Sequence, residues 1–161
     1  MWEWKLIPSF EVDHDILEPG IYVSRRDYQG KEVLTTFDIR LKKPNVEPTI
    51  DNPAIHSMEH IAATFLRNHS EWGTEMVYFW PMWCRTGFYG VFKWDLESKD
   101  ILGIITDTIQ DIIDFEWKIP GCGKKECGNY LDHNLEMAKF EAKLFLGKIK
   151  NFTDKNLKYA S

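Results

Sequence analysis

The chain has 161 residues, which is enough for one domain, residues 1–161, that buries its core without disulfide or metal staples. Its 20 basic and 25 acidic residues give a net charge of −5 without any Lys- or Arg-rich block, which argues against a nucleic-acid partner. No apolar run approaches the roughly 20 residues of a membrane-spanning helix, and the first residues do not read as a signal peptide, so we expect a cytoplasmic protein with no membrane segment.

The first half of the chain predicts a β-hairpin followed by a helix. Residues 21–24 and 32–41 are β-prone and are separated by a turn at Gly30. After a proline-containing connection, Asn52 is the expected cap and Pro53 lies in the first turn of a helix that runs to about residue 68.

The second half predicts two more strands and two more helices. Residues 76–80 and 86–93 are rich in aromatic side chains, and a short loop joins them. Isoleucines at helical spacing follow Ser98, and an apolar helical face over residues 135–149 follows a loop at residues 119–129. Strands grouped apart from helices, without regular alternation, indicate an α+β fold: an antiparallel or mixed sheet with helices packed on one face, as a single-domain two-layer sandwich.

The segment with the clearest chemistry is His56-Ser57-Met58-Glu59-His60. Residues four apart on a helix are neighbours, so His56 and His60 can face one cation while Glu59 stands beside them. Imidazole is the commonest metal ligand, and a nearby carboxylate can move protons. The segment therefore predicts a metal site that still needs a third ligand, the alternative being a solvated helix face that carries these groups by chance.

Three cysteines, Cys84, Cys122 and Cys127, make a disulfide scaffold improbable because their number is odd and a reducing compartment is expected. An unpaired thiol in such a chain is a candidate metal ligand or reactive group. Cys122 is better interpreted as a small buried apolar residue.

Five short motifs occur in one order along nearly the whole chain: SFEVDH at 9–14, TFDIR at 36–40, HSMEH at 56–60 with FLRN at 65–68, PM at 81–82 with CRTGFY at 84–89, and IPG at 119–121 with CGNY at 127–130. Together they resemble the S-ribosylhomocysteine lyase (LuxS) family, enzymes of the activated methyl cycle that also release the precursor of a quorum-sensing autoinducer. One such motif would be weak, but five in the family's order and spacing are specific.

The resemblance implies that His56, His60 and Cys127 bind one divalent metal per subunit, with iron(II) expected and zinc as the other candidate. Water or substrate oxygen would take the fourth position, as in catalytic metal sites. It also implies that Glu59 and Cys84 are the catalytic acid/base pair for cleaving the thioether of S-ribosylhomocysteine to homocysteine and 4,5-dihydroxy-2,3-pentanedione. In these roles Cys84, as a thiolate favoured by the metal and by the adjacent Arg85, would take carbon-bound protons, and Glu59 would carry the oxygen-bound ones.

Family members are homodimers with active sites at the subunit interface. The resemblance places Ser9, His14, Arg40 and Arg67 near the homocysteine end of the substrate, where the guanidinium fork of Arg40 suits a carboxylate. The alternatives are an ion pair of Arg40 with Asp38 or Glu11 on the sheet, and a plain loop histidine at position 14. Neither His69 nor His133 is assigned a role.

The chain departs from the family at several tryptophans. Many members have an Asp where this chain has Tyr78, and glycine where it has Trp80, Trp83 and Trp117. An indole at position 83 restricts the backbone beside Cys84 and is expected to crowd the substrate pocket. One hypothesis is that some of the seven tryptophans are glycines in the organism, because a reassigned UGA codon was translated with the wrong reading.

Two other functions remain open on the sequence. The first is an inverted-motif metallopeptidase, in which a downstream carboxylate would be the third ligand and Cys127 would be dispensable. The second is a catalytically inert relative, in which the metal only braces the fold and the indoles of Trp80 and Trp83 close the pocket.

Overall fold

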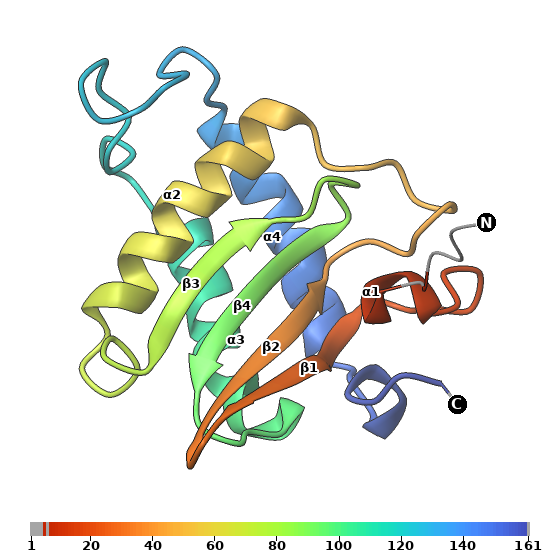
Figure 1. Cartoon of the computed structure of the whole chain (residues 1–161). Helices are drawn as coiled ribbons and strands as arrows, with labels where there is room; N and C mark the ends of the chain where they lie inside the picture. Colours follow the sequence, from red (N-terminus) through yellow and green to blue (C-terminus); the bar gives the residue numbers. More distant parts are fainter. Residues whose placement is uncertain (1–4, 6, 161) are drawn as a thin grey trace, which may run out of the picture.

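The computed structural model describes residue 5 and residues 7–160, and the side chains of residues 8 and 9 are not described. Its centre is a four-stranded antiparallel sheet in the order β1-β2-β4-β3 (Figure 1). The strands are β1 (Gly20–Gln29), β2 (Glu32–Arg40), β3 (Met76–Pro81) and β4 (Gly87–Lys93). The expected α+β class with an antiparallel sheet is therefore confirmed.

The hairpin of β1 and β2 turns at Gly30, as the sequence predicts, with φ at +62° in the region that favours glycine. Strand β1 is longer than the predicted residues 21–24, because pairing continues past a bulge near Val23 and Arg25 to the end of the hairpin. This extension is solvent-exposed and polar, so it lacks the alternating apolar pattern that marks a half-buried strand.

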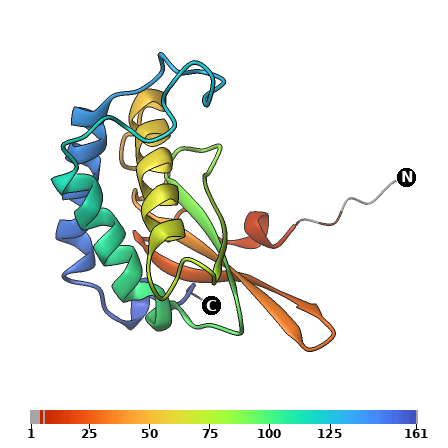
Figure 2. The same cartoon turned by 90° about the vertical axis from the view of Figure 1, so that its left-hand side faces the viewer.

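Three long helices cover one face of the sheet: α2 (Asn52–Asn68), α3 (Ser98–Asp114) and α4 (Leu135–Ile149), as Figure 2 shows. Their apolar stripes meet the inward side chains of the strands in one core. Fully buried residues of both layers take part in this core, among them Phe37, Ile39, Phe92, Met58, Ile61, Ile101 and Phe145. The two-layer arrangement expected from the sequence is present, and within the described part of the chain no helix layer covers the opposite face of the sheet (Figure 2).

The start of α2 differs by one residue from the sequence expectation. Asp51, rather than Asn52, is the cap, since its carboxylate accepts a hydrogen bond of 2.8 Å from the backbone N–H of Ala54. Pro53 lies in the first turn as predicted. The cap fixes where the helical register begins, and this register determines which face of α2 carries the two histidines.

Two short elements complete the fold: α1 (Pro8–Glu11) and the 3-10 turn η1 (Asp154–Asn156). They lie near each other at the β1 edge of the sheet (Figure 1). Among the residues that the structure describes, the search for a helix of sufficient length and apolar character to cross a bilayer finds none.

Candidate metal centre and active site

Helix α2 places His56 and His60 on the same face, with their ring centroids 4.7 Å apart. A segment far along the chain completes the group, because Cys127 and His133 from the connection between α3 and α4 lie against these rings. One ligand atom from each of the four residues lies within 4.8 Å of the others. The sulfur of Cys127 is 3.5 Å from Nε2 of His56 and 4.0 Å from Nε2 of His133.

Two of the three imidazoles of this cluster are oriented by backbone carbonyls. Nδ1 of His56 lies 2.8 Å from the carbonyl oxygen of Asp132, and Nδ1 of His60 lies 2.8 Å from that of Pro120. Carbonyl oxygens only accept, so each of these nitrogens carries the proton and each Nε2 keeps its lone pair. Hydrogen bonds of this kind are the usual outer support of metal-binding histidines.

The ring of His133 is oriented through the buried hydroxyl of Ser57. This hydroxyl donates to the carbonyl of Pro53 at 2.8 Å and accepts from the backbone N–H of Asn134 at 2.9 Å. Its remaining lone pair faces Nδ1 of His133 at 3.3 Å, so this nitrogen is the donor and Nε2 points to the cluster. Burial and the neighbouring histidines hold the pKa of His133 below its usual value, which favours the neutral ring.

The donor set suits a divalent transition metal. Neutral imidazole nitrogens and a thiolate bind zinc and iron well, and the backbone N–H of Asn129 already donates to the Cys127 sulfur at 3.4 Å. Sequence reasoning did not assign His133, because a histidine six residues after a loop cysteine has no fixed geometry relative to it. The one available signal for a partner such as His133 was Ser57 in the HSMEH motif, because a buried serine hydroxyl needs hydrogen-bond partners.

Glu59 lies beside the cluster in a hollow of about 280 Å³ that also contains His60, Arg67, Tyr78 and Gly121. Burial raises the pKa of Glu59 above its usual value, although the two cluster histidines oppose this shift. Gly121 has φ at +67°, and a Cβ there would contact Nδ1 of His60 at 3.4 Å. A glycine at this position therefore lets the loop close over the metal ligands.

Cys84 lies in the loop between β3 and β4 and is exposed. Its sulfur is 3.7 Å from Nη1 of Arg40 and 3.1 Å from Oγ1 of Thr86. The guanidinium of the adjacent Arg85, which the sequence suggested as a support for the thiolate, donates to the carbonyl of Ile50 at 3.3 Å. Arg40, from the neighbouring strand, is the cation beside the sulfur.

Arg40 is almost fully buried and forms an ion pair with Asp38, one of the two arrangements that the sequence left open. Nε donates to Oδ1 of Asp38 at 3.0 Å, Nη2 donates to Oδ2, and Nη1 donates to Thr86 at 2.6 Å. Burial alone would lower the pKa of Arg40, but the Asp38 carboxylate and then Cys84 raise it, so the guanidinium remains charged.

The other expected substrate residues are divided between two hollows. His14 is half-buried, lies with Cys84 and residues 44–49 in a hollow of about 510 Å³, and places Nδ1 2.8 Å from the carbonyl of Val12. Arg67 lies in the Glu59 hollow and donates to the carbonyl of Val77 at 2.6 Å. Ser9 lies in α1, and its side chain is outside the described part of the structure.

Neither indole beside Cys84 closes these hollows. The side chain of Trp83 is 101% exposed relative to a free residue and is not among the residues that line either hollow within one chain. Trp80 packs against the rings of Tyr78 and Tyr89. Cys122 is half-buried and packs against the core, which agrees with the prediction that it is a small apolar packing residue.

Comparison with known proteins agrees with this geometry. The family described as S-Ribosylhomocysteinase (LuxS) matches residues 7–156. The chain belongs to the LuxS family.

Relatives of similar length lie across several bacterial groups, and each carries the name S-ribosylhomocysteine lyase. The protein from Borrelia garinii is 52% identical over 155 residues, which cover 96% of this chain and 99% of the relative. The protein from Clostridium beijerinckii is 53% identical over 154 residues, covering 95% and 97%. The Porphyromonas gingivalis protein is 50% identical with the same coverage.

Proposed function

We propose that this protein is a metal-dependent carbon–sulfur lyase that cleaves the thioether of S-ribosylhomocysteine to homocysteine and 4,5-dihydroxy-2,3-pentanedione. The observation that carries the proposal is the convergence of Cys127 with His56 and His60, in a chain whose 50–53% identical relatives bear the name of this activity. One lyase domain over residues 1–161 is part of the proposal, supported by the family match to residues 7–156.

His56, His60 and Cys127 would hold the metal, with iron(II) expected and zinc as the other candidate. Imidazole and thiolate suit both ions, and no geometric feature of the cluster separates them. When bound, the metal supplies Lewis acidity to the sugar oxygens, typically worth several kcal/mol. In the neutral rings, the hydrogen bonds from Nδ1 of His56 and His60 to backbone oxygens make Nε2 the ligand nitrogen.

The proposed chemistry is a series of proton transfers followed by elimination. The sugar carbonyl moves along the carbon chain until a proton next to it can be removed and homocysteine leaves as its thiolate. Cys84 is the proposed group for carbon-bound protons, because Arg40 at 3.7 Å stabilises a thiolate electrostatically. Glu59, whose pKa is raised by burial, is the proposed carrier of oxygen-bound protons.

For the homocysteine end of the substrate, we propose Ser9, His14, Arg40 and Arg67. His14 is supported by its position with Cys84 in one hollow, and Arg67 by its position with Glu59 in the other. Arg40 is already paired with Asp38, so any contact with substrate would come from the Nη1 edge that faces Cys84.

The proposed assembly is a homodimer in the cytoplasm, and the dicarbonyl product is a proposed autoinducer precursor. Cys84 and Glu59 line different hollows, which is the arrangement expected if two chains together complete each site. Large apolar side chains are also exposed near these hollows: Phe10, Val46, Tyr78 and Trp83. Such exposure is typical of an interface.

The decisive experiment is release of homocysteine from S-ribosylhomocysteine by protein loaded anaerobically with iron(II), detected with a thiol reagent. We expect turnover that falls about 100- to 10,000-fold in Glu59→Gln and Cys84→Ala while both variants keep their metal. Metal at full occupancy without homocysteine would instead select the inert, metal-braced relative.

A second measurement separates the lyase from the metallopeptidase. Cys127→Ala is expected to lose the bound metal, since it removes the thiolate, the only sulfur ligand of the proposed set of His56, His60 and Cys127. Retention of stoichiometric metal by this variant, measured by elemental analysis after dialysis, would favour the peptidase. Cys122→Ala is the matched control and should keep its metal.

A further inference from the structure

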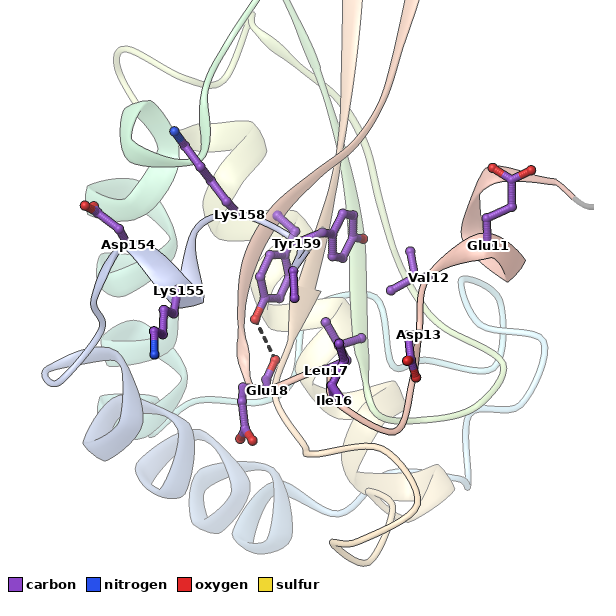
Figure 3. Close-up of a pocket in the computed structure, with 12 residues that line it drawn as sticks. Glu11, Val12, Asp13, Ile16, Leu17, Glu18, Asp154, Lys155, Lys158 and Tyr159 are labelled. Atoms are coloured by element: carbon purple, nitrogen blue, oxygen red, sulfur yellow. Dashed lines mark hydrogen bonds between the residues drawn. The ribbon is translucent and has the colours of Figure 1, made fainter.

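The C-terminal segment after α4 returns to the β1 edge of the sheet and is anchored there. Nδ2 of Asn156 donates to the carbonyl of Pro19 at 2.9 Å, and Leu157 is buried in the core. Beyond it, Lys158 and Tyr159 lie across a hollow of about 900 Å³ from Val12 and other residues of the segment before β1 (Figure 3). None of the four residues of the metal cluster lines this hollow.

The side chain of Tyr159 is engaged at both its ring and its hydroxyl. The ring stacks on that of Tyr22, with centroids 4.7 Å apart and planes inclined by 11°. The hydroxyl donates to Oδ2 of Asp38 at 2.9 Å. Burial and the negative charge of Asp38 raise the pKa of Tyr159 far above its ordinary value, so the hydroxyl remains a donor at any physiological pH.

Asp38 joins Tyr159 to the arginine beside the reactive sulfur. Its carboxylate is 1% exposed and accepts from Nε and Nη2 of Arg40 as well as from the Tyr159 hydroxyl. The bidentate pair fixes the guanidinium plane, and the remaining nitrogen, Nη1, faces Thr86 and the sulfur of Cys84. A continuous series of contacts therefore runs from Tyr159 through the buried Asp38–Arg40 pair to the sulfur of Cys84.

We propose that Tyr159 is a positioning residue for Cys84, acting through Asp38 and Arg40. The inference rests on the proposed function only in giving Cys84 an acid/base role. A buried carboxylate needs its hydrogen-bond donors to remain ionised and in place. Without the Tyr159 hydroxyl, the Asp38 carboxylate has one hydrogen-bond donor fewer, so its negative charge offsets more of the positive charge of Arg40. The positive potential at the Cys84 sulfur is then lower.

The groups around the Cys84 sulfur come from four parts of the chain. Arg40 and Thr86 contact it from β2 and from the loop that carries it, and His14 and Glu47 line the same hollow. Conservative substitution at position 159 leaves all of these groups unchanged. A change in thiol reactivity would therefore be transmitted through the Asp38–Arg40 pair.

The test compares Tyr159→Phe with Tyr22→Phe in the full-length, metal-loaded protein. Each variant removes one hydroxyl from the same stacked pair, but the Tyr22 hydroxyl donates to the carbonyl of Glu18 at 2.8 Å rather than to Asp38. The readout is the rate of iodoacetamide alkylation of the Cys84 peptide as a function of pH, measured by mass spectrometry. Thermal unfolding of each variant checks that the fold is kept.

For Tyr159→Phe, we expect the midpoint of the alkylation profile to move up by about half a pH unit, which slows alkylation about threefold at pH values well below the midpoint. Tyr22→Phe should follow the parent protein. An unchanged midpoint in Tyr159→Phe, or an equal shift in both variants, would overturn the inference. Alkylation does not require lyase turnover, so a shifted profile in a protein that releases no homocysteine would support the inference while refuting the proposed function.

Discussion

At the scale of single residues, Trp94 occupies a conformation that suits glycine. Its φ is +78°, whereas the other non-glycine residues at positive φ in the described part of the chain, Asn45 and Arg85, lie at +59° and +57°. The indole is 54% exposed and gains one contact, a hydrogen bond from Nε1 to Glu75. Trp83 and Trp117 are even more exposed, although neither is at positive φ. These settings agree with the hypothesis that some tryptophans replace glycines.

The strain at this position gives a direct prediction. A side chain at strongly positive φ costs about 1–2 kcal/mol relative to glycine. We therefore expect Trp94→Gly to be more stable than Trp94→Ala by about 1 kcal/mol in chemical denaturation, since both variants lose the indole and only glycine relieves the backbone. The opposite order would contradict the assigned backbone conformation.

The reassigned-codon hypothesis itself is tested on protein from the native organism. Mass spectrometry of the peptides that contain positions 83 and 94 should find glycine there. Tryptophan at position 83 ends the hypothesis for the site that matters most, because that residue precedes Cys84. In that case, Trp83→Gly is expected to raise turnover, and a variant no faster than the parent would show that the exposed indole is neutral.

At the scale of elements, the loop between β2 and α2 is tied to α4 by one ion-pair network. Nζ of Lys148 donates to the carbonyl of Leu41 at 3.0 Å and to both carboxylate oxygens of Glu47, at 2.7 and 2.8 Å. The backbone N–H of Lys43 also donates to Glu47 at 2.6 Å. This loop forms a wall of the Cys84 hollow, so α4 supports the active-site region from behind.

This network predicts a pH-dependent stability. Burial alone would raise the pKa of Glu47, but Lys148 and the N–H of Lys43 hold it below the ordinary value of 4.5. The ionised form therefore stabilises the fold above about pH 4.5, and this contribution is lost as the pH falls through the lowered value. Glu47→Gln should cost about 1 kcal/mol at pH 7 in urea unfolding.

The same measurement in acid supplies the check. The difference in unfolding free energy between Glu47→Gln and the parent should shrink steadily as the pH falls below 4.5, because Glu47 is then protonated and, like glutamine, carries no charge. Glu71→Gln, at an exposed glutamate between α2 and β3, is the control and should stay close to the parent at each pH. A Glu47→Gln difference that is constant with pH would indicate lost packing rather than lost charge.

The elements themselves were largely predictable, and the contacts between them were not. The helical spacing of His56 and His60 and the β-prone segments follow from local periodicity, which tertiary packing preserved. The cap at Asp51 and the role of His133 depend on backbone conformation and on a partner 76 residues away, Ser57. The pairing of Arg40 with Asp38 follows from their positions two apart on one strand face. The further hydrogen bonds of this pair, from Arg40 to Thr86 and from Tyr159 to Asp38, join residues far apart in the sequence and could not be predicted from it.

At the scale of the whole molecule, the two halves of the proposed acid/base pair are separated. Cys84 lies with His14 in one hollow, and Glu59 lies with Arg67 in another. The sheet face without a helix layer and the exposed Tyr78 provide a surface on which a second chain could pair. A site shared between chains is the arrangement that reconciles this separation with the proposed chemistry.

Mixing two inactive variants tests the shared site. Dimers re-formed from equal amounts of Cys84→Ala and Glu59→Gln should be half mixed, and each mixed dimer would have one of its two sites intact. Homocysteine release should therefore recover to about one quarter of the parent rate. If Cys84 and Glu59 of the same chain worked together, every site would remain defective and the mixture would stay inactive.

The route of the chain from α3 to α4 has a consequence for the lifetime of the protein. Residues 115–134 form no helix or strand, and they supply Cys127 and His133 while exposing Lys124 and Lys125. A bound ion would clamp this connection to α2, whereas its loss would free a long lysine-bearing loop for proteolytic attack. Metal starvation would then shorten the survival of the enzyme as well as silence it, so that the abundance of the protein would follow the supply of the ion.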